Sequence, residues 1–341
     1  MSSLAAIHEC QNDCPEEALE LTVLAPMYNE ADNIVATVTT INEALSQFGR
    51  SWELLLVNDG SSDNTLEIVQ ELAKQFPNLR IISYPVNCGR GKALRTGFEH
   101  ARGKYVITID FDLSYSPEHI LRIYEELADP EQMNDVVLGS AYMAEGRVVG
   151  VNPWRVFISR LGNKILEYTF PQPFKTSTCI LRGYRRQVLE ALELESNGKE
   201  IHLEILSKVC ALGFMVKEIP ATLQNRKSGH SKFKLRKTSA SHLVFSVFEK
   251  PLLVFGLVGV LLTLLGLAIG IYIVWLRYAG TLNPGRPLIP LMLILLIMGS
   301  QFFSFAFVAA QNNHLRNEIY RLQRQINLLT MKKRNESQHH S

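Results

Sequence analysis

The sequence predicts an α/β fold: a doubly wound, mainly parallel sheet, followed by a C-terminal hairpin of two transmembrane helices and a short coiled-coil-like helix. Two observations support this prediction. Short β-branched runs alternate with helical patterns in the first part of the chain, as they do in parallel sheets with helical crossovers. The last part holds two apolar segments, each longer than the roughly 20 residues that span a bilayer.

Length and composition limit the class of protein. The chain has 341 residues, enough for one large domain or two ordinary ones, and its net charge of +2 gives no reason to expect nucleic acid as a partner. The mean hydropathy of +0.04 is high for a soluble protein, and the apolar excess lies mostly after residue 250. Five cysteines without zinc spacing indicate reduced thiols in a cytosolic compartment. Residues 1–19 lack the features of a signal peptide and are predicted to be a flexible arm.

Four strand–helix units are expected at the start of a folded domain that spans residues 20–237. The first strand is 21–25, stopped by Pro26, and its helix is capped by Asp32 or Asn33 and runs to about Phe48. The later strands are 52–57, 80–84 and 105–109, and the later helices are 65–75, 92–101 and one that begins at Glu118. Right-handed crossovers bring the carboxyl ends of these strands to one edge of the sheet.

Polar residues follow three of these four strands. Asn29 and Glu30 follow the first, Asp59 follows the second, and Asp110 and Asp112 follow the fourth. Open α/β sheets bind ligands at the carboxyl ends of their strands. Two carboxylates that a backbone turn brings together suit a hard divalent cation. The pattern therefore favours a ligand cleft over three unrelated polar turns.

Two common nucleotide-binding motifs are incomplete in this chain. Gly89-Arg90-Gly91 begins a G-x-G, but Leu94 stands at the third glycine of the dinucleotide fingerprint. Gly91-Lys92 resembles the end of a P-loop, but Val86 and Ala93 stand where that loop has Gly and Ser or Thr. The sequence therefore supports neither an NAD enzyme nor a P-loop NTPase.

Several motifs in a fixed order carry a resemblance to a known family. Pro26-Met27-Tyr28-Asn29-Glu30, residues 57–63, residues 87–93 and Asp110-Phe111-Asp112 together resemble glycosyltransferase family 2, the inverting, nucleotide-sugar-dependent transferases of the GT-A fold. The R-x-x-G-x-S-K run from Arg226 to Lys232 and the preceding Glu218-Ile219-Pro220 resemble the dolichyl- or polyprenyl-phosphate sugar synthase branch. Residues 152–155, 159–160, 163 and 181–186 resemble a bacterial or archaeal subgroup.

The resemblance implies a role for each site residue. The nucleotide-sugar-binding residues would be Pro26, Tyr28, Glu30, Asp59, Lys92 and Asp110, with Asp59 accepting hydrogen bonds from the nucleobase. Asp110 and Asp112 would bind Mg²⁺ or Mn²⁺, which neutralises the leaving diphosphate. The acceptor phosphate would be bound by Arg226, Ser231, Lys232 and Arg155, and Arg226 counts with the two aspartates as catalytic.

The implied reaction is inverting transfer of a hexose from a UDP- or GDP-sugar to polyprenyl or dolichyl phosphate, as in cell-envelope glycosylation. The acceptor phosphate is ionised near neutral pH, so its oxygen attacks the sugar C1 without an obligatory general base. Three departures from the mannosyl relatives leave the sugar and the nucleotide open. Ser114 stands where a metal-contacting Gln is common, Ala141-Tyr142 where an Arg is common, and Thr176 near an acidic position.

The C-terminal part is predicted to anchor the chain in a membrane. Residues 251–276 and 287–310 are the predicted spans, and residues 238–250 a juxtamembrane amphipathic helix. Lys and Arg crowd before the first span and after the second, so the positive-inside rule places the catalytic domain and the C-terminus in the cytoplasm, at a prokaryotic plasma membrane.

A heptad pattern follows the second span, in a predicted cytoplasmic helix over residues 311–331. Leucines and isoleucines recur there at alternating spacings of four and three, which is the pattern of a coiled-coil seam; they are Leu315, Ile319, Leu322, Ile326 and Leu329. One interpretation of the seam is a homo-oligomer formed through the transmembrane and C-terminal helices, with Gln301 of the second span able to hydrogen-bond across spans in the same chain or another. A helix packed on the catalytic domain is the alternative.

Two other functions stay open on the sequence. A processive polysaccharide synthase of the same family would need a Q-x-x-R-W motif, which Gln224-Asn225-Arg226 does not supply. A catalytically silent membrane scaffold would have no need for Asp110, Asp112 and the run that begins at Arg226. Both observations favour the lipid-phosphate transferase.

Overall fold

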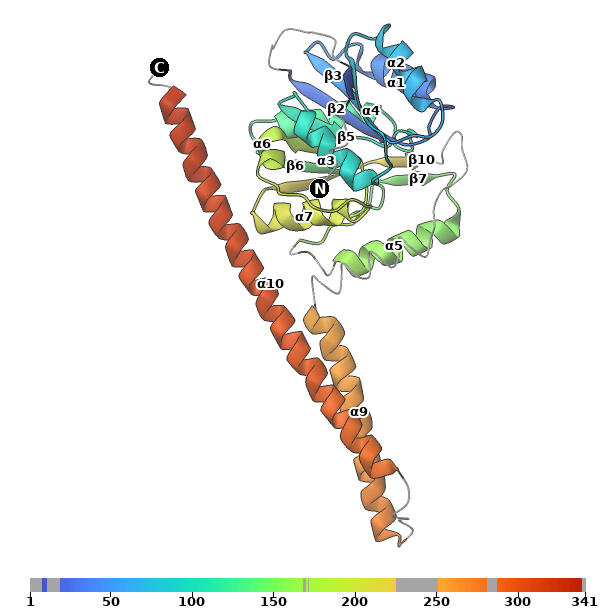
Figure 1. The fold of residues 1–341 in the computed structure, drawn as a ribbon, viewed down its shortest axis with the longest axis vertical. Helices are drawn as coiled ribbons and strands as arrows, with labels where there is room; N and C mark the ends of the chain where they lie inside the picture. The colour runs from blue at the N-terminus through green and yellow to red at the C-terminus, as the bar shows by residue number, and fades with distance from the viewer. Residues whose placement is uncertain are drawn as a thin grey trace. The chain divides into compact units, whose positions relative to one another are not determined.

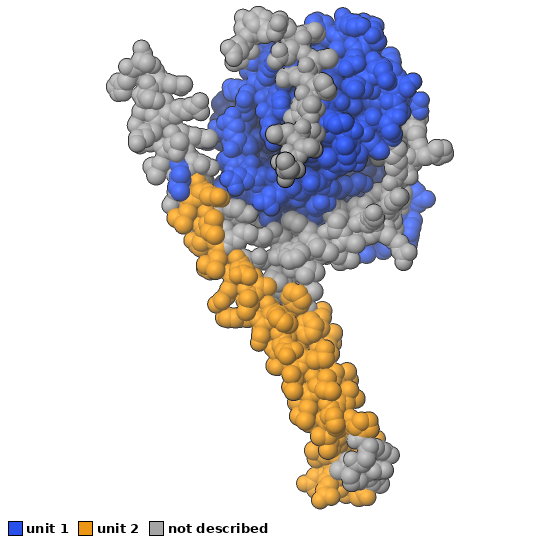
Figure 2. All heavy atoms as spheres, viewed as in Figure 1, with its two compact units in different colours: residues 1–238, 326–341 blue, residues 239–325 orange. Residues whose placement is uncertain are grey.

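The computed structural model describes residues 8–10, 19–167, 170, 172–224, 251–280 and 287–338. The chain divides into two compact units (Figure 2), of which one comprises residues 1–238 and 326–341 and the other residues 239–325. The predicted domain boundaries stay a prediction. The predicted juxtamembrane helix, 238–250, lies outside the described residues, and so do Arg226, Ser231 and Lys232.

The first unit is built of strands and helices that alternate along the chain (Figure 1). The strands are β1 (His8–Cys10), β2 (Leu21–Met27), β3 (Trp52–Asp59), β4 (Leu79–Tyr84), β5 (Tyr105–Thr108), β6 (Val136–Ser140), β7 (Arg147–Val149), β8 (Arg182–Arg185), β9 (Val216–Pro220) and β10 (Thr222–Gln224). The helices are α1 (Ile34–Leu45), α2 (Thr65–Ala73), α3 (Arg90–His100), α4 (Glu118–Ala128), α5 (Pro153–Glu167), α6 (Arg186–Glu190) and α7 (Ile201–Ala211).

The described strands form an eight-stranded sheet in the order β1-β4-β3-β2-β5-β8-β6-β9, and β10 pairs with β7 in a separate two-stranded sheet. Strands β4, β3, β2 and β5 are parallel to one another, whereas β1 and β8 run antiparallel to their neighbours. The predicted doubly wound, mainly parallel sheet is confirmed. The chain moves outward from β2 to β3 and β4 and then returns to the other side of β2 as β5, so the strand order reverses between β2 and β5. Such a reversal is where open α/β sheets bind ligands.

Pro26 lies inside β2, although the sequence predicted that it would stop the strand. It pairs with Val57 of β3, and β2 continues to Met27. On its other side β2 pairs with β5 only as far as Leu24, opposite Thr108. Beyond Leu24 that side of β2 has no ladder to complete, so the missing N–H of Pro26 breaks no hydrogen bond between strands.

A short strand, β1, occurs within residues 1–19, which were predicted to be a flexible arm. It pairs antiparallel with β4, His8 opposite Ser83 and Cys10 opposite Ile81. Three residues with no periodic pattern carry too little local signal to predict a strand, and their position is defined by the unpaired edge of β4.

Two long helices make up the described part of the second unit, α9 (Pro251–Tyr278) and α10 (Leu288–Gln338), of which α10 belongs to this unit as far as residue 325. By length and composition, Phe255–Tyr278 and Leu288–Asn312 can cross a membrane, and only 11% of each apolar window is buried. They are therefore not core helices of a soluble domain, and they indicate membrane anchoring. The helices approach closely at small residues: a Cβ added at Gly299 would lie 2.3 Å from the Thr263 hydroxyl and 3.2 Å from the Gly259 carbonyl.

The second span and the heptad segment form one continuous helix, α10, whereas the sequence analysis treated 287–310 and 311–331 as separate parts. No Gly or Pro occurs between Gly299 and the end of α10, so nothing in this stretch breaks the helix. Four of the five seam residues have described side chains, and each is more than half exposed; they are Leu315, Ile319, Leu322 and Ile326.

Candidate active site

The turn after β5 holds the two aspartates of the D-x-D motif. Phe111 between them is buried, and its carbonyl accepts a hydrogen bond from the Thr37 hydroxyl at 2.9 Å. Leu113 adopts the left-handed conformation, with φ +50°, and the Ser114 N–H donates to Asp112 Oδ1 at 3.0 Å. The backbone therefore leaves the strand direction at this point, and both carboxylates lie in one partly exposed turn at the carboxyl edge of the sheet.

Asp110 forms an ion pair that the sequence analysis missed. Arg90 Nη2 lies 3.1 Å from Asp110 Oδ1, and the Ser114 hydroxyl donates to Asp110 Oδ2 at 3.4 Å. Arg90 is the first residue of α3 and follows the loop after β4. Arg90 belongs to the 87–93 motif, which the sequence analysis recognised. The sequence did not show that the loop after β4 meets the turn after β5, because that meeting depends on the strand order.

The residues at this turn suit a divalent cation that is shared with a ligand. Among the described residues, no group of three or more His, Cys, Asp or Glu side chains could hold a metal ion. Asp110 and Asp112 are a pair of hard oxygen donors, and Ser114 is already engaged with Asp110. Mg²⁺ typically binds through one or two carboxylates and completes its shell with water and substrate phosphates. The donor set therefore fits a metal–diphosphate site rather than an all-protein cage.

The Asp59 carboxylate is buried, and both of its oxygens accept hydrogen bonds from neighbouring residues of the chain. Its Oδ1 accepts hydrogen bonds from the Tyr84 hydroxyl at 2.7 Å and the Cys88 N–H at 2.8 Å. Its Oδ2 accepts from Asn87 Nδ2 and the Gly89 N–H, both at 2.9 Å. The residue is 4% exposed. Burial, and then the bond to this carboxylate, raise the pKa of the Tyr84 hydroxyl. Asp59 thus shapes the loop that leads to Arg90, and its nucleobase contact stays a prediction.

The loops after β2 and β3 are joined by hydrogen bonds. Asn29, with φ +52°, donates its N–H to the Ser61 hydroxyl at 2.9 Å, and the Glu30 N–H donates to the Thr65 hydroxyl at 2.9 Å. The Glu30 carboxylate accepts from Asn33 Nδ2 at 2.9 Å. Asn33 directly precedes α1, which is one of the two capping positions expected from the sequence. Its side chain donates to Glu30, however, and makes no capping hydrogen bond.

Three other predicted nucleotide-sugar residues lie at the same sheet edge. Pro26 is half-buried near the end of β2, and Tyr28 is exposed just beyond it. Lys92 is half-buried in the first turn of α3. The structure therefore brings Pro26, Tyr28 and Lys92 to the edge that holds Asp110.

A loop before α7 covers the start of α3. The Gly91 N–H donates to the Asn197 carbonyl at 2.7 Å, and a Cβ added at Gly91 would lie 2.3 Å from the Ser196 carbonyl. Glu204 accepts from the Glu195 and Ser196 N–H groups, both at 2.9 Å. Burial by itself would raise the pKa of Glu204, but hydrogen bonds from Lys208 and from this loop outweigh it and lower that pKa. Glu204 is thus a structural residue that holds this loop in place.

Strand β10 runs beside the D-x-D turn. The Gln224 N–H donates to the Ser114 carbonyl at 2.8 Å, and Leu223 forms an isolated bridge with Tyr115. The Thr222 N–H donates to His119 Nε2 at 3.0 Å. Gln224 is the last described residue before the R-x-x-G-x-S-K run, which lies outside the described part of the chain.

The first unit matches a known family over the region just described. Residues 22–193 match the family described as "Glycosyl transferase family 2", which covers half of the chain. The chain belongs to glycosyl transferase family 2. The family predicted from the sequence motifs is confirmed, and the protein is a glycosyltransferase.

Curated relatives of this glycosyltransferase align over most of its length. The undecaprenyl-phosphate 4-deoxy-4-formamido-L-arabinose transferase of Edwardsiella ictaluri (strain 93-146) is 30% identical over 308 residues, which is 88% of this chain and 90% of the relative. The transferase of the same name from Klebsiella pneumoniae (strain 342) is 27% identical over 305 residues, with the same coverage. The predicted polyprenyl-phosphate branch is thus the branch of these relatives.

Solved structures share the fold of the glycosyltransferase unit. Glucosyl-3-phosphoglycerate synthase from Mycobacterium tuberculosis, in complex with Mn²⁺, UDP and phosphoglyceric acid, gives a TM-score of 0.50 at 19% identity, over 66% of this chain and 75% of that one. The same enzyme with phosphoglyceric acid gives 0.51, over 68% and 80%. The expected GT-A-like architecture is confirmed at the level of the fold.

The segment between α5 and β8 is fastened to the sheet at several points. Glu218 of β9 accepts the Lys175 and Thr176 N–H groups, both at 2.9 Å, and the Thr176 and Ser140 hydroxyls lie 2.7 Å apart. From α5, Asn163 Oδ1 accepts the Ser177 N–H at 2.9 Å. Thr176 therefore fills a buried structural position. Arg155 lies in α5, and its side chain is outside the described part of the structure.

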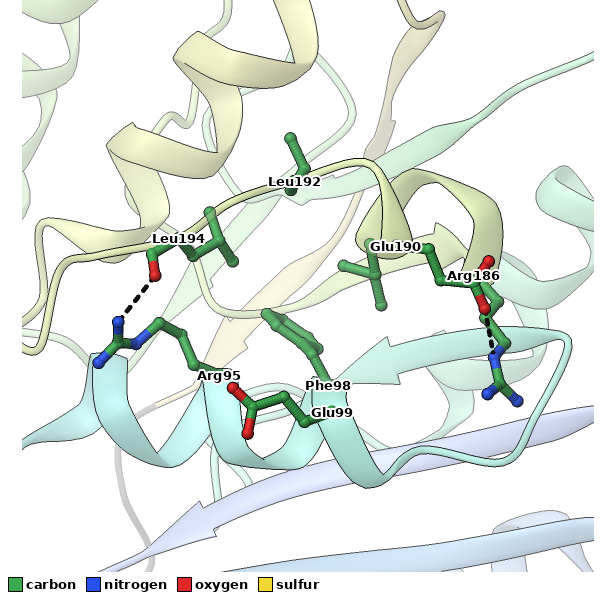
Figure 3. Close-up of a pocket in the computed structure, with 8 residues that line it drawn as sticks. Arg95, Phe98, Glu99, Arg186, Glu190, Leu192 and Leu194 are labelled. Carbon is green, nitrogen blue, oxygen red and sulfur yellow. Dashed lines mark hydrogen bonds and ion pairs between the residues drawn. The ribbon is translucent and has the colours of Figure 1, made fainter. Parts of the chain in front are cut away.

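A cavity of about 220 Å³ lies away from the D-x-D turn, between α3 and the region of α6 (Figure 3). Phe98, Leu189, Leu192 and Leu194 supply its apolar lining, with charged residues at the rim. None of its lining residues was predicted as a site residue. Arg95 at its edge donates to the Leu194 carbonyl at 2.7 Å, which fastens the loop that covers the start of α3.

Proposed function

We propose that this family 2 glycosyltransferase transfers a sugar, with inversion at C1, from a nucleotide sugar to a polyprenyl phosphate lipid. One observation supports it above the others: the Gln224–Ser114 hydrogen bond of 2.8 Å holds β10, the last described segment before the predicted acceptor-phosphate run, at the D-x-D turn. The curated relatives carry an undecaprenyl-phosphate acceptor in their names. Two helices able to cross a membrane would keep the enzyme beside such a lipid.

On the donor side, Asp110 and Asp112 would hold Mg²⁺ or Mn²⁺, and the bound cation would supply positive charge against the departing diphosphate. Pro26, Tyr28, Glu30 and Lys92 would line the nucleotide-sugar site. We assign Asp59 to the same site because its carboxylate holds the 87–89 loop, which leads to Arg90. Arg90 begins a helix at this edge, so its guanidinium is suited to the same diphosphate through charge-assisted hydrogen bonds.

On the acceptor side, Arg226, Ser231, Lys232 and Arg155 would bind the lipid phosphate. An arginine fork, a hydroxyl and a lysine charge together match a phosphate monoester. One phosphate oxygen forms the new bond to C1 as the bond from C1 to the diphosphate oxygen breaks, and the nucleoside diphosphate leaves. The attacking oxygen is already ionised, so no side chain has to remove a proton.

The sugar is the open part of the proposal. The sequence predicted a hexose, whereas the named relatives transfer 4-deoxy-4-formamido-L-arabinose, which is a pentose derivative. Membranes that contain the full chain and a polyprenyl phosphate would be given a panel of labelled UDP- and GDP-hexoses, together with nucleotide-linked 4-deoxy-4-formamido-L-arabinose. We expect one donor to label the lipid fraction when Mg²⁺ or Mn²⁺ is present. If every donor leaves the lipid unlabelled, the proposed reaction is wrong.

The arrangement in the membrane is proposed from the charge pattern. The catalytic unit and the C-terminus would lie in the cytoplasm, because Lys and Arg precede the first span and follow the second. The exposed seam of α10 would join copies of the chain. Labelling of engineered cysteines from each side of the membrane tests the orientation. Cross-linking in mild detergent that yields only monomer would contradict the oligomer.

A further inference from the structure

The loop before α7, residues 193–200, lies directly on the first turn of α3, and we call it the strap. A Cβ added at Gly91 would lie 2.3 Å from the Ser196 carbonyl oxygen. A Cβ added at Gly89, where φ is +99°, would lie 2.5 Å from the Asn197 carbonyl oxygen. The atoms that these Cβ positions meet belong to the backbone of the strap, so no side-chain rotation would relieve the clash. The strap and α3 are therefore in backbone contact, and glycine permits it.

The strap takes up a backbone N–H group at the start of α3. The Gly91 N–H donates to the Asn197 carbonyl at 2.7 Å. On the other side of Arg90, the Gly89 N–H donates to Asp59 Oδ2 at 2.9 Å. Anions commonly bind the N–H groups of a helix N-terminus, but here the protein itself uses the N–H groups that flank Arg90. What α3 offers to a diphosphate therefore depends on its side chains, and the Arg90 guanidinium already lies at the D-x-D turn.

Arg95 joins the strap to α3 by two hydrogen bonds. Its guanidinium donates to the Leu194 carbonyl at 2.7 Å (Figure 3) and to Asn197 Oδ1 at 2.6 Å. A planar guanidinium fixes the direction of both bonds. Asn197 is also the residue whose carbonyl accepts the Gly91 N–H. Arg95 therefore holds in place the group that caps the first turn of α3.

We propose that Arg95 is a positioning residue for the nucleotide-sugar donor. By holding the strap on α3, it keeps the first turn of the helix in the orientation that brings Arg90 to Asp110 and to the donor diphosphate. The Arg90 side chain is 32% exposed, so its direction depends on the turn that carries it. The hold of the strap on α3 rests on the contacts above, and its purpose rests on the proposed function.

Amide hydrogen exchange tests the hold of the strap without any ligand. Arg95→Met keeps an apolar stem and removes both hydrogen bonds. In the full chain in detergent, we expect exchange of the Gly91 amide to speed up at least about tenfold. Arg186→Met is the matched control, because Arg186 lines the same cavity but bonds the Arg102 carbonyl and Glu190, which lie outside the strap. An unchanged exchange rate at Gly91 in Arg95→Met overturns the proposal.

A double-mutant cycle with Arg90 separates positioning from a general loosening of the fold. UDP and GDP are the probes, and calorimetry in the presence of Mn²⁺ measures their affinity for the full chain. We expect Arg95→Met to weaken binding of the preferred nucleoside diphosphate about fivefold, and to have no effect in a chain that already carries Arg90→Gln. An equal loss in both backgrounds overturns the proposal, because Arg95 would then act without Arg90. An unchanged affinity in the wild-type background also overturns it.

Gly91→Ala separates the strap from α3 in a second way and leaves Arg95 in place. Because its Cβ would meet the Ser196 carbonyl, we expect the same loss of affinity and the same dependence on Arg90. Gly162→Ala is the control, since a Cβ at that position would meet no atom within 4 Å. If Arg95→Met does not fold, Gly91→Ala decides the proposal by the same criteria.

Affinity for Mn²⁺ without nucleotide distinguishes this proposal from the proposed function. A displaced Arg90 competes less for Asp110, so Arg95→Met should raise the affinity for Mn²⁺ about twofold, and not when Arg90→Gln is present. If the wild-type chain binds Mn²⁺ but neither UDP nor GDP, the proposed donor is wrong, and a rise in Mn²⁺ affinity still supports the positioning of Arg90. If exchange at Gly91 speeds up while the Mn²⁺ affinity stays the same, the strap has a structural role alone and the positioning is overturned.

Discussion

Two acidic turns lie at the same edge of the sheet, and they use their carboxylates differently. Asp59 is buried, and both of its oxygens accept hydrogen bonds from the chain around it. Asp110 and Asp112 are half-buried, and Asp110 forms an ion pair with the long side chain of Arg90. Arg90 can swing away when a ligand arrives, whereas the loop around Asp59 would have to be rebuilt. Asp59 is therefore expected to build the site, and the D-x-D pair to act in it.

The largest effect that this comparison predicts is on activity at the D-x-D turn. Asp112→Asn should lower the transfer rate on the order of 10³-fold, because it removes half of the charge that holds the cation against the diphosphate. Thermal unfolding should change little, since Asp112 is partly exposed. Mn²⁺ binding followed by calorimetry should be lost with the activity. Asp32→Asn, at an exposed carboxylate, is the control. A variant at Asp112 with full activity contradicts the assignment.

The next effect is on stability at the Asp59 turn. Asp59→Asn should reduce the free energy of unfolding by about 3 kcal/mol, because the buried amide offers fewer acceptors to the N–H groups of Cys88 and Gly89 that the carboxylate now binds. Urea unfolding of the full chain in detergent, followed by a signal from the first unit, measures this. A variant that is fully stable and yet fails to bind nucleotide would reverse the comparison, because it would give Asp59 a direct role with the base.

A smaller effect is expected where Arg90 and a cation compete for Asp110. Arg90→Gln should raise the affinity of the nucleotide-free protein for Mn²⁺ about threefold, since a partly exposed ion pair contributes less than about 1 kcal/mol. The same change should weaken binding of the nucleoside diphosphate. Arg50→Gln, which opens an exposed pair with Glu20, is the matched control. Unchanged affinity for Mn²⁺ would mean that Arg90 and the cation use different oxygens.

The smallest effect is a pH dependence of β10. Burial, and then the nearby charge of Arg122, lower the pKa of His119 below its ordinary 6.5, so the fold favours the neutral ring that accepts the Thr222 N–H. This contribution to stability is complete above pH 6.5 and is lost as the pH falls through the lowered folded pKa. Exchange of the Thr222 amide should then speed up by less than about tenfold, after correction for intrinsic exchange. His119→Gln should abolish that dependence, and if it persists in the variant another group is responsible.

The sequence by itself determined the fold class, the order of the strand–helix units, the family and the two apolar spans. Local patterns carry that information: β-branched runs for buried strands, a helical period for their covers, and long apolar stretches for the membrane. The D-x-D turn was identifiable for the same reason, because its two carboxylates lie one residue apart in the chain.

Tertiary structure decided what depends on contacts between distant parts of the chain. Pro26 could continue β2 because β5 stops pairing at Leu24, and the residues on either side of Pro26 do not reveal this. Separate loops meet at one sheet edge, and two sets of contacts follow from this. Asn87 and Gly89 donate hydrogen bonds to the Asp59 carboxylate, and Arg90 forms an ion pair with Asp110. The Gln224–Ser114 bond joins residues 110 positions apart in sequence, which no local pattern can register. A motif thus supplies the chemical groups, and strand order decides which of them face a ligand and which hold the protein together.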